Sequence, residues 1–272
     1  MPSIAEKRAR FHELHRSGCF VIPNPWDVGS AVWLQQQGFP ALATTSSGYA
    51  WSHARPDNGI TRDMALQHLA ELVAATDVPV NADFESGFAV DAAGVAESVR
   101  LAVATGVAGL SIEDSTGDAA NPLMPLDVAV ERMKAARRAI DAAGGDTMLV
   151  GRAENFIVGR PDLDDVLRRL AAYAEAGADC LYAPGLQTEA QVRAVVEAVA
   201  PKPVNLLVGT ASAWTVADIA AMGVRRISVG GALARSAWGG FQRAVELLAQ
   251  GRFDGFADAA PGKVLNVAFA PR

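Results

Sequence analysis

Short apolar runs alternate with longer amphipathic stretches along the whole chain, and this alternation predicts the fold. Eight runs rich in β-branched and apolar residues have the length of buried strands. They lie at residues 19–23, 41–45, 79–83, 109–113, 148–152, 180–183, 204–208 and 226–230. A stretch with helical spacing follows each run, at residues 28–38, 61–76, 92–106, 126–144, 163–177, 189–200, 215–223 and 232–251. Several of these stretches end in Gly, which favours the end of a helix.

Nearly continuous apolar strands that alternate with helices predict a parallel sheet covered by helices on its outer face. Eight such units favour a closed (β/α)8 TIM barrel over an open doubly wound sheet, which usually has fewer strands and a GxGxxG nucleotide motif after the first. No such motif follows residues 19–23. Because no linker or change of composition divides the chain, we expect one domain over residues 1–272, with an N-terminal helix and a weakly patterned C-terminal tail.

Composition narrows the classes of function. Half of the 272 residues are hydrophobic, and 24 Lys and Arg against 30 Asp and Glu give a net charge of −6. This balance excludes the basic surface that a nucleic-acid partner requires, and no apolar run approaches the roughly 18 residues of a membrane span. The two cysteines, Cys19 and Cys180, form neither a disulfide framework nor a zinc motif, so we expect a reducing, cytoplasmic setting.

Acidic residues gather where the third and fourth predicted strands end. Asp83 and Glu85 follow one strand, and Glu113 and Asp114 follow the next. In barrel enzymes the chemistry lies at these carboxyl ends, and crowded like charges require a cation. A donor set of oxygens alone favours Mg²⁺, with Mn²⁺ as an alternative. Any single acid here can instead cap a helix, and we expect Asp114 to be such a cap or to support the ligands from behind rather than to be a ligand. Arg152 on the fifth strand has the planar fork that suits a carboxylate.

Other polar residues leave alternatives open. The turn at residues 44–50 either binds an anion through backbone N–H groups or contains small residues only because the turn is tight. Tyr49, His53 and Tyr182 are candidate proton donors by position alone, and His53 is equally compatible with a solvated loop histidine.

The combination of motifs across nearly the whole chain resembles the isocitrate lyase and phosphoenolpyruvate mutase superfamily. The segments that carry the resemblance are FVIPNPWDVGSA, TTSSGYAWSHARPDNG, PVNADFESGF, GVAGLSIEDSTGD, VGRAENFIVG, AYAEAGADCLY and PVNLL. The resemblance implies a (β/α)8 barrel, a homotetramer arranged as a dimer of dimers with the last helix exchanged between neighbours, and Mg²⁺ that holds an α-oxo acid or its enolate. Trp238, Phe241, Val245 and Leu248 give that helix an apolar face compatible with exchange or with coverage of its own barrel.

The same resemblance implies roles for individual residues. Ser46, Ser47 and Gly48 contact the substrate carboxylate, and Thr45, which ends the strand before them, is placed in the same binding site. The metal is held, directly or through water, by Asp57, Asp83 and Glu113. Arg152 pairs with a substrate carboxylate and Asn205 lines the pocket, so Arg152 and Glu113 are the residues on which turnover is expected to depend.

The chain also departs from the superfamily pattern. Isocitrate and methylisocitrate lyases carry a lysine–cysteine–glycine–histidine run in the loop after strand 4, where this chain reads STGDAANPLMPL. Asn81 replaces the first acid of the Asp-x-Asp motif, Ala43 replaces a strand-2 tyrosine, and the glutamate after strand 6 has no counterpart. Phosphonopyruvate enzymes place Lys-Thr-Asn in the same loop, and only Asn121 corresponds.

Three functions follow in order of preference. The first is a Mg²⁺-dependent lyase that cleaves a C–C bond of a small α-oxo or 2-hydroxy di- or tricarboxylic acid, such as oxaloacetate or an alkylmalate, through an enolate. The second is a phosphonopyruvate mutase or hydrolase that acts on a P–C bond. The third is a non-catalytic barrel that binds an acid.

Overall fold

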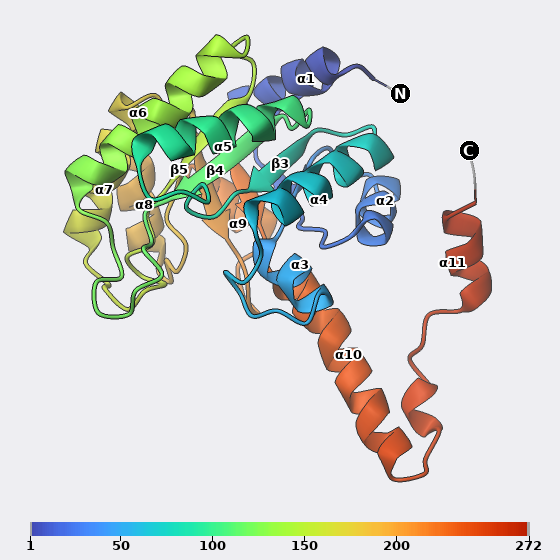
Figure 1. Cartoon of the computed structure of the whole chain (residues 1–272). Helices are drawn as coiled ribbons and strands as arrows, with labels where there is room; N and C mark the ends of the chain where they lie inside the picture. Colours follow the sequence, from blue (N-terminus) through green and yellow to red (C-terminus); the bar gives the residue numbers. More distant parts are fainter. Residues whose placement is uncertain (1, 271–272) are drawn as a thin grey trace.

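The computed structural model describes residues 2–270 and contains the predicted barrel (Figure 1). One eight-stranded parallel sheet has the order β1-β8-β7-β6-β5-β4-β3-β2. Its strands are β1 (Phe20–Ile22), β2 (Leu42–Ala43), β3 (Val80–Asp83), β4 (Gly109–Glu113), β5 (Met148–Arg152), β6 (Cys180–Tyr182), β7 (Val204–Leu207) and β8 (Arg226–Ser228). The gap between β1 and β2 is spanned by a hydrogen bond from Ala43 N–H to the Pro23 carbonyl (3.1 Å), so the barrel is nearly closed. The (β/α)8 prediction is confirmed.

Helices alternate with the strands and cover the outside of the sheet (Figure 1). They are α1 (Ile4–Arg16), α2 (Val28–Gln36), α3 (Ser46–Ser52), α4 (Arg62–Ala75), α5 (Ala92–Ala104), α6 (Leu126–Ala142), α7 (Leu163–Glu175), α8 (Glu189–Val199), α9 (Val216–Ala221), α10 (Ala232–Ala249), the 3-10 turn η1 (Asp254–Phe256) and α11 (Gly262–Ala268). Most begin at a side-chain cap, such as Thr188 on α8, which bonds the backbone as a capping box. None of the helices in residues 2–270 is long and apolar enough to cross a membrane.

Helix α1 closes the amino-terminal end of the barrel. Phe11 is fully buried and packs in a cluster with Ile22, Ala41, Ala108 and Met148. Because this end is filled with apolar side chains, the cavity among residues 2–270 that contains the barrel interior opens toward the carboxyl ends of the strands. The fold therefore concentrates accessible polar groups at the end where barrel chemistry is found.

The C-terminal segment extends away from the barrel. Helix α10 projects outward, and the chain returns through η1 to α11 (Figure 1). Gln36 Nε2 donates a hydrogen bond to the Ala268 carbonyl (2.6 Å), which holds α11 against α2. Along α10, Trp238 and Phe241 leave 40% and 58% of their surface exposed.

Candidate active site

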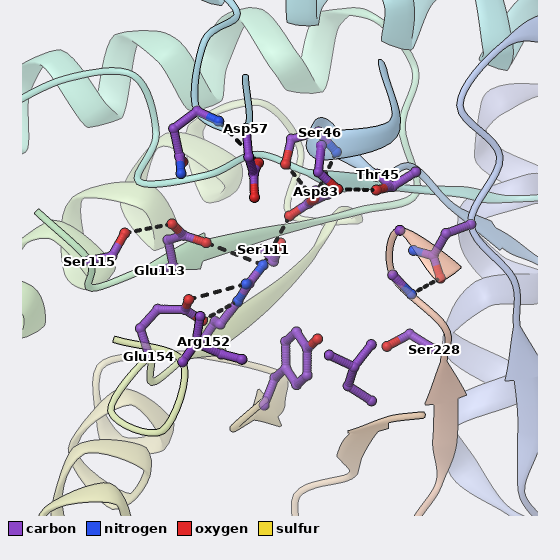
Figure 2. A pocket seen from close by; sticks show the side chains of 18 of the residues that line it. Thr45, Ser46, Asp57, Asp83, Ser111, Glu113, Ser115, Arg152, Glu154 and Ser228 are labelled. Atoms are coloured by element: carbon purple, nitrogen blue, oxygen red, sulfur yellow. Dashed lines mark hydrogen bonds and ion pairs between the residues drawn. The ribbon is translucent and has the colours of Figure 1, made fainter. Parts of the chain in front are cut away.

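A cavity of about 560 Å³ opens at the carboxyl ends of the strands, as the barrel fold requires. Figure 2 shows that acidic, hydroxyl and guanidinium groups converge in it from separate strands. The predicted site residues that line this cavity are Thr45, Ser46, Ser47, Asp57, Asp83, Glu113, Arg152, Tyr182 and Asn205. The structure thus brings these nine predicted residues together in one cavity, although they form only part of its lining.

Three predicted site residues do not line the cavity. Gly48 lies in the first turn of α3, where its N–H donates to Thr45 Oγ1 (3.3 Å) and a Cβ would come within 2.9 Å of Trp26. Gly48 is therefore required by close packing. Tyr49 points away from the cavity and stacks on His68, with ring centroids 3.9 Å apart. His53 is exposed, and its Nδ1 lies 3.1 Å from the Tyr49 carbonyl oxygen.

Tyr49 and His53, the two proton-donor candidates in this segment, therefore do not line the cavity, because Tyr49 packs against His68 of α4 and His53, which follows α3, is exposed. The sequence predicted a turn at this position, whereas residues 46–52 form a helix capped by Thr45. Of the three proton-donor candidates, only Tyr182 lines the cavity.

Arg152 is the centre of the acidic cluster. Its Nη1 lies 3.2 Å from Asp83 Oδ1 and 3.2 Å from Glu113 Oε2. Its Nε and Nη2 donate to the two carboxylate oxygens of Glu154. The guanidinium carbon also lies 5.1 Å from the centre of the Tyr182 ring. One cation therefore faces three carboxylates from β3, β4 and the loop after β5, as Figure 2 shows.

The acids exceed the cations near this cluster, and their protonation reflects the excess. Burial, together with the charges of Asp83 and Glu113, raises the pKa of Glu85 to about 8. Burial also raises the pKa of Glu154 to about 8, although its pairing with Arg152 acts in the opposite direction. The pKa of Glu113 is raised because its burial outweighs the pairing with Arg152. Such a cluster favours an added cation.

The donor set fits a hard divalent ion that keeps part of its water shell. The side chains of Asp83 and Glu113 converge, since both reach the same guanidinium nitrogen at 3.2 Å. Asp57 lines the same cavity, and all three offer only oxygen. Within residues 2–270 no group of three or more His, Cys, Asp or Glu side chains is arranged to hold a metal directly. Mg²⁺ commonly binds through one or two carboxylates and several waters, so the residues fit that ion.

The loop after β4 forms part of the cavity wall. Gly117, Asp118, Ala119 and Pro122 line the cavity. The loop is ordered by its own bonds, including Asp118 N–H to Thr116 Oγ1 (3.0 Å). It presents a carboxylate to the cavity and, as its sequence shows, no Lys, Cys or His.

A buried network supports the acids from behind. Asp114 Oδ1 accepts the N–H of Glu154 (2.8 Å), and Oδ2 accepts bonds from the Tyr173 hydroxyl (2.6 Å) and Arg169 Nη1 (3.1 Å). Asp165 in turn accepts a bond from Arg169 Nε (2.6 Å). Asp114 does not line the cavity, so it supports the neighbouring residues, in keeping with the expectation that it is not a ligand.

Sequence reasoning missed several cavity residues. Glu154 follows Arg152 by two positions and lines the cavity while almost fully buried. Ser111, Arg226 and Ser228 also line it from inside the barrel. The alternation of strand side chains contained this information, because residues two apart on a strand face the same side.

Fold and site together define a (β/α)8 barrel of the enzyme type, with an acidic, cation-compatible cavity at the carboxyl ends of its strands. The comparisons with known proteins give the family. Residues 11–249 match the phosphoenolpyruvate phosphomutase family. The chain belongs to this family and is an enzyme of the isocitrate lyase/phosphoenolpyruvate mutase type, which confirms the resemblance seen in the sequence.

Individual relatives support this placement. The Mycobacterium tuberculosis protein Rv1998c, itself uncharacterized, is 31% identical over 222 residues, which cover 81% of each chain. An oxaloacetate decarboxylase of Bradyrhizobium diazoefficiens is 30% identical over 190 residues, or 66% of this chain and 64% of the relative. A Burkholderia cenocepacia structure provisionally called a lyase or mutase is 48% identical, with a TM-score of 0.94 over 98% of this chain and 97% of that one.

Proposed function

We propose that the protein is a Mg²⁺-dependent lyase that cleaves a C–C bond of a small α-oxo or 2-hydroxy di- or tricarboxylic acid through an enolate. The observation that carries the proposal is the convergence of Asp83, Glu113 and Arg152 in one cavity. Relatives named 2-methylisocitrate lyase and oxaloacetate decarboxylase, at 28–30% identity, agree with carbon–carbon chemistry on such acids.

Each residue has a role that follows from its chemistry. Asp83 and Glu113, with Asp57 through water, are the residues that would hold the ion. When bound, Mg²⁺ supplies positive charge where negative charge develops on the enolate oxygen. Arg152 supplies the positive charge for a substrate carboxylate, and the Ser47 hydroxyl lies in the same wall of the cavity. Ser46 orients Asp83 by donating its N–H and Oγ to Oδ2.

Proton transfer falls to a residue whose O–H group faces the cavity. Tyr182 lines it beside Arg152, and burial raises the pKa of its hydroxyl to about 12. The hydroxyl therefore carries its proton at neutral pH. We propose this hydroxyl as the donor that a departing carbanion requires, without any contribution from Tyr49 or His53.

Assembly and location form part of the proposal. The exposed apolar residues of α10 are suited to burial in another copy of the chain, as a dimer of dimers. The unpaired thiols of Cys19 and Cys180 agree with the cytoplasm.

The test is an NMR assay of the purified protein with oxaloacetate, 2-methylisocitrate, 2,3-dimethylmalate and phosphonopyruvate, each with Mg²⁺ and with a chelator. We expect chelator-sensitive release of an α-oxo acid from one carbon-only substrate. R152M and E113Q should each lower kcat/KM by about a hundredfold or more, because each removes charge stabilisation at the site. E131Q, on the exposed face of α6, is the matched control and should retain full activity. Phosphate or phosphoenolpyruvate formed from phosphonopyruvate would replace the proposal with P–C chemistry.

A further inference from the structure

A second guanidinium lies deep in the same cavity, on the opposite side of Tyr182 from the acidic cluster. Arg226 begins β8, points into the barrel and is only 2% exposed. Its Nε donates to Asn205 Oδ1 (2.8 Å) and its Nη1 lies 3.3 Å from Asn81 Oδ1. Both partners are neutral amides. Within residues 2–270 Arg226 forms no ion pair, and its Nη2 has no protein acceptor.

The surroundings hold this guanidinium in place. Asn205 Nδ2 donates to Ser228 Oγ (2.9 Å), which fixes the amide that Arg226 contacts. Gly109 lies below Asn81, and no larger residue fits there, since a Cβ would lie 2.7 Å from both Asn81 Oδ1 and Phe11 Cε1. Phe11 then closes the barrel beneath. The side chain of Arg226 therefore spans the interior from β8 to β3 above an apolar floor.

The two arginines of the cavity differ in their counter-charges. Arg152 faces Asp83, Glu113 and Glu154, so its charge is balanced by the protein. Arg226 faces none, although burying an unpaired charge is strongly unfavourable. A ligand anion is the partner that would balance it, and the cavity gives such a ligand access, since Arg226 and the residues of the mouth line one continuous space.

We propose that Arg226, held by Asn205 and Asn81, binds a second carboxylate of the ligand and so selects dicarboxylic over monocarboxylic acids. The inference rests on the proposed function in taking the ligand to be a carboxylic acid. One carboxylate lies at the mouth with Arg152, and the second reaches past Tyr182 to Arg226. Register supports this path, because Tyr182 pairs with Asn205 and Asn205 pairs with Arg226 across β6, β7 and β8.

The competing interpretation is that Arg226 only ties β8 to β7 and β3. The two readings differ in what a substitution changes. If Arg226 only links strands, its substitution changes stability alone. If it binds an anion, its substitution changes the preference between ligands with the same number of carbons and different charge. Malonate and propionate are such a pair, with three carbons each and two carboxylates against one.

Calorimetric binding of malonate and propionate, each with Mg²⁺ and with a chelator, provides the test. The wild-type protein should bind malonate at least about tenfold tighter than propionate under both conditions, as expected for a hydrogen-bonded charge pair. R226M should reduce that ratio to within about threefold, and R226K should retain part of it because the charge remains without the planar fork. R225M is the matched control, since Arg225 precedes it in the chain and bonds the Gly18 carbonyl outside the cavity.

N205D keeps the volume of the site and gives Arg226 a carboxylate partner, so it should abolish the preference even if R226M fails to fold. A wild-type protein without preference, or variants R226M and N205D that retain it, would overturn the inference. Because binding requires no turnover, loss of preference in R226M together with a silent substrate panel would reject only the proposed reaction.

Discussion

Replacement of Tyr173 by Phe tests the hydrogen-bonded network behind the acidic cluster most directly. Y173F removes the buried hydroxyl that donates a hydrogen bond of 2.6 Å to Asp114 Oδ2 and leaves the aromatic ring unchanged. Y49F is its matched control. Tyr49 is similarly buried, but its hydroxyl makes no hydrogen bond to any residue in the described part of the chain, and its ring stacks on His68.

The expected magnitude follows from the partners that remain. A hydrogen bond to a charged group contributes about 1.5–3 kcal/mol. After Y173F, Asp114 still accepts bonds from Arg169 and from the Glu154 N–H, so the carboxylate is not left unpaired. We therefore expect a loss of about 2 kcal/mol in the free energy of unfolding. At roughly 2–4 °C per kcal/mol for a chain of this size, Tm should fall by about 4–8 °C.

Urea unfolding followed by circular dichroism at pH 7 measures the difference, with kcat/KM measured in parallel. Y173F should also lower activity, because Asp114 fixes the backbone of Glu154 and directly follows Glu113. Y49F should match the wild-type protein in both stability and activity. If Y173F unfolds within 0.5 kcal/mol of Y49F, the network does not stabilise the site, which would refute the reasoning.

Two further predictions concern pH and assembly. The pKa of Glu85 is about 8 in the folded chain against 4.5 as its ordinary value, so the folded state alone holds this proton between those pH values and stability falls as pH rises through that window. With a chelator present, the free energy of unfolding of the wild-type protein should fall with pH between pH 5 and 8, and E85Q should make this fall smaller by roughly 1 kcal/mol per pH unit. The same fall in E85Q as in the wild-type protein would contradict the raised pKa of Glu85. Wild-type protein should elute as an oligomer in light-scattering chromatography, and the double variant W238E/F241E should reduce its mass; the exposed change Q242E is the control, and equal masses for all three would reject α10 as the interface.

The strands were predictable because each is short, apolar and followed by an amphipathic stretch. β4 and β5 occupy the predicted residues, 109–113 and 148–152, without any shift. Helix α3 was not predictable in the same way. Its seven residues show no helical apolar pattern. The start of the helix depends in part on tertiary contacts, since Ser46 N–H and Oγ both donate to Asp83 Oδ2, which is distant in sequence.

The site shows the same division between local and non-local information. Parallel strands bring their carboxyl ends to one edge, so Asp83, Glu113 and Arg152 were expected to meet and do. Tyr49 lies only a few residues beyond its strand, but once the chain turns as a helix the direction of its side chain depends on helical rotation. Proximity along the sequence to a strand end therefore predicts a cavity residue only while the chain remains extended.

Arg226 is a cavity residue that the sequence did not predict, because it lies at the opposite end of its strand. A charged residue at the first position of a strand is ordinarily solvated, and only the burial of Arg226 and its bonds to Asn205 and Asn81 show that it points inward. Its neighbours then determine its character. Arg152 is surrounded by acids, so its removal would leave several buried carboxylates without a partner and destabilise the fold. Arg226 has neutral amide partners and no acid beside it, so under the proposal made above a ligand carboxylate is the partner that would balance its buried charge. Under that proposal the acidic mouth holds a cation and Arg226, inside the barrel, receives the second anionic group of the acid, so the two ends of one ligand meet opposite protein charges.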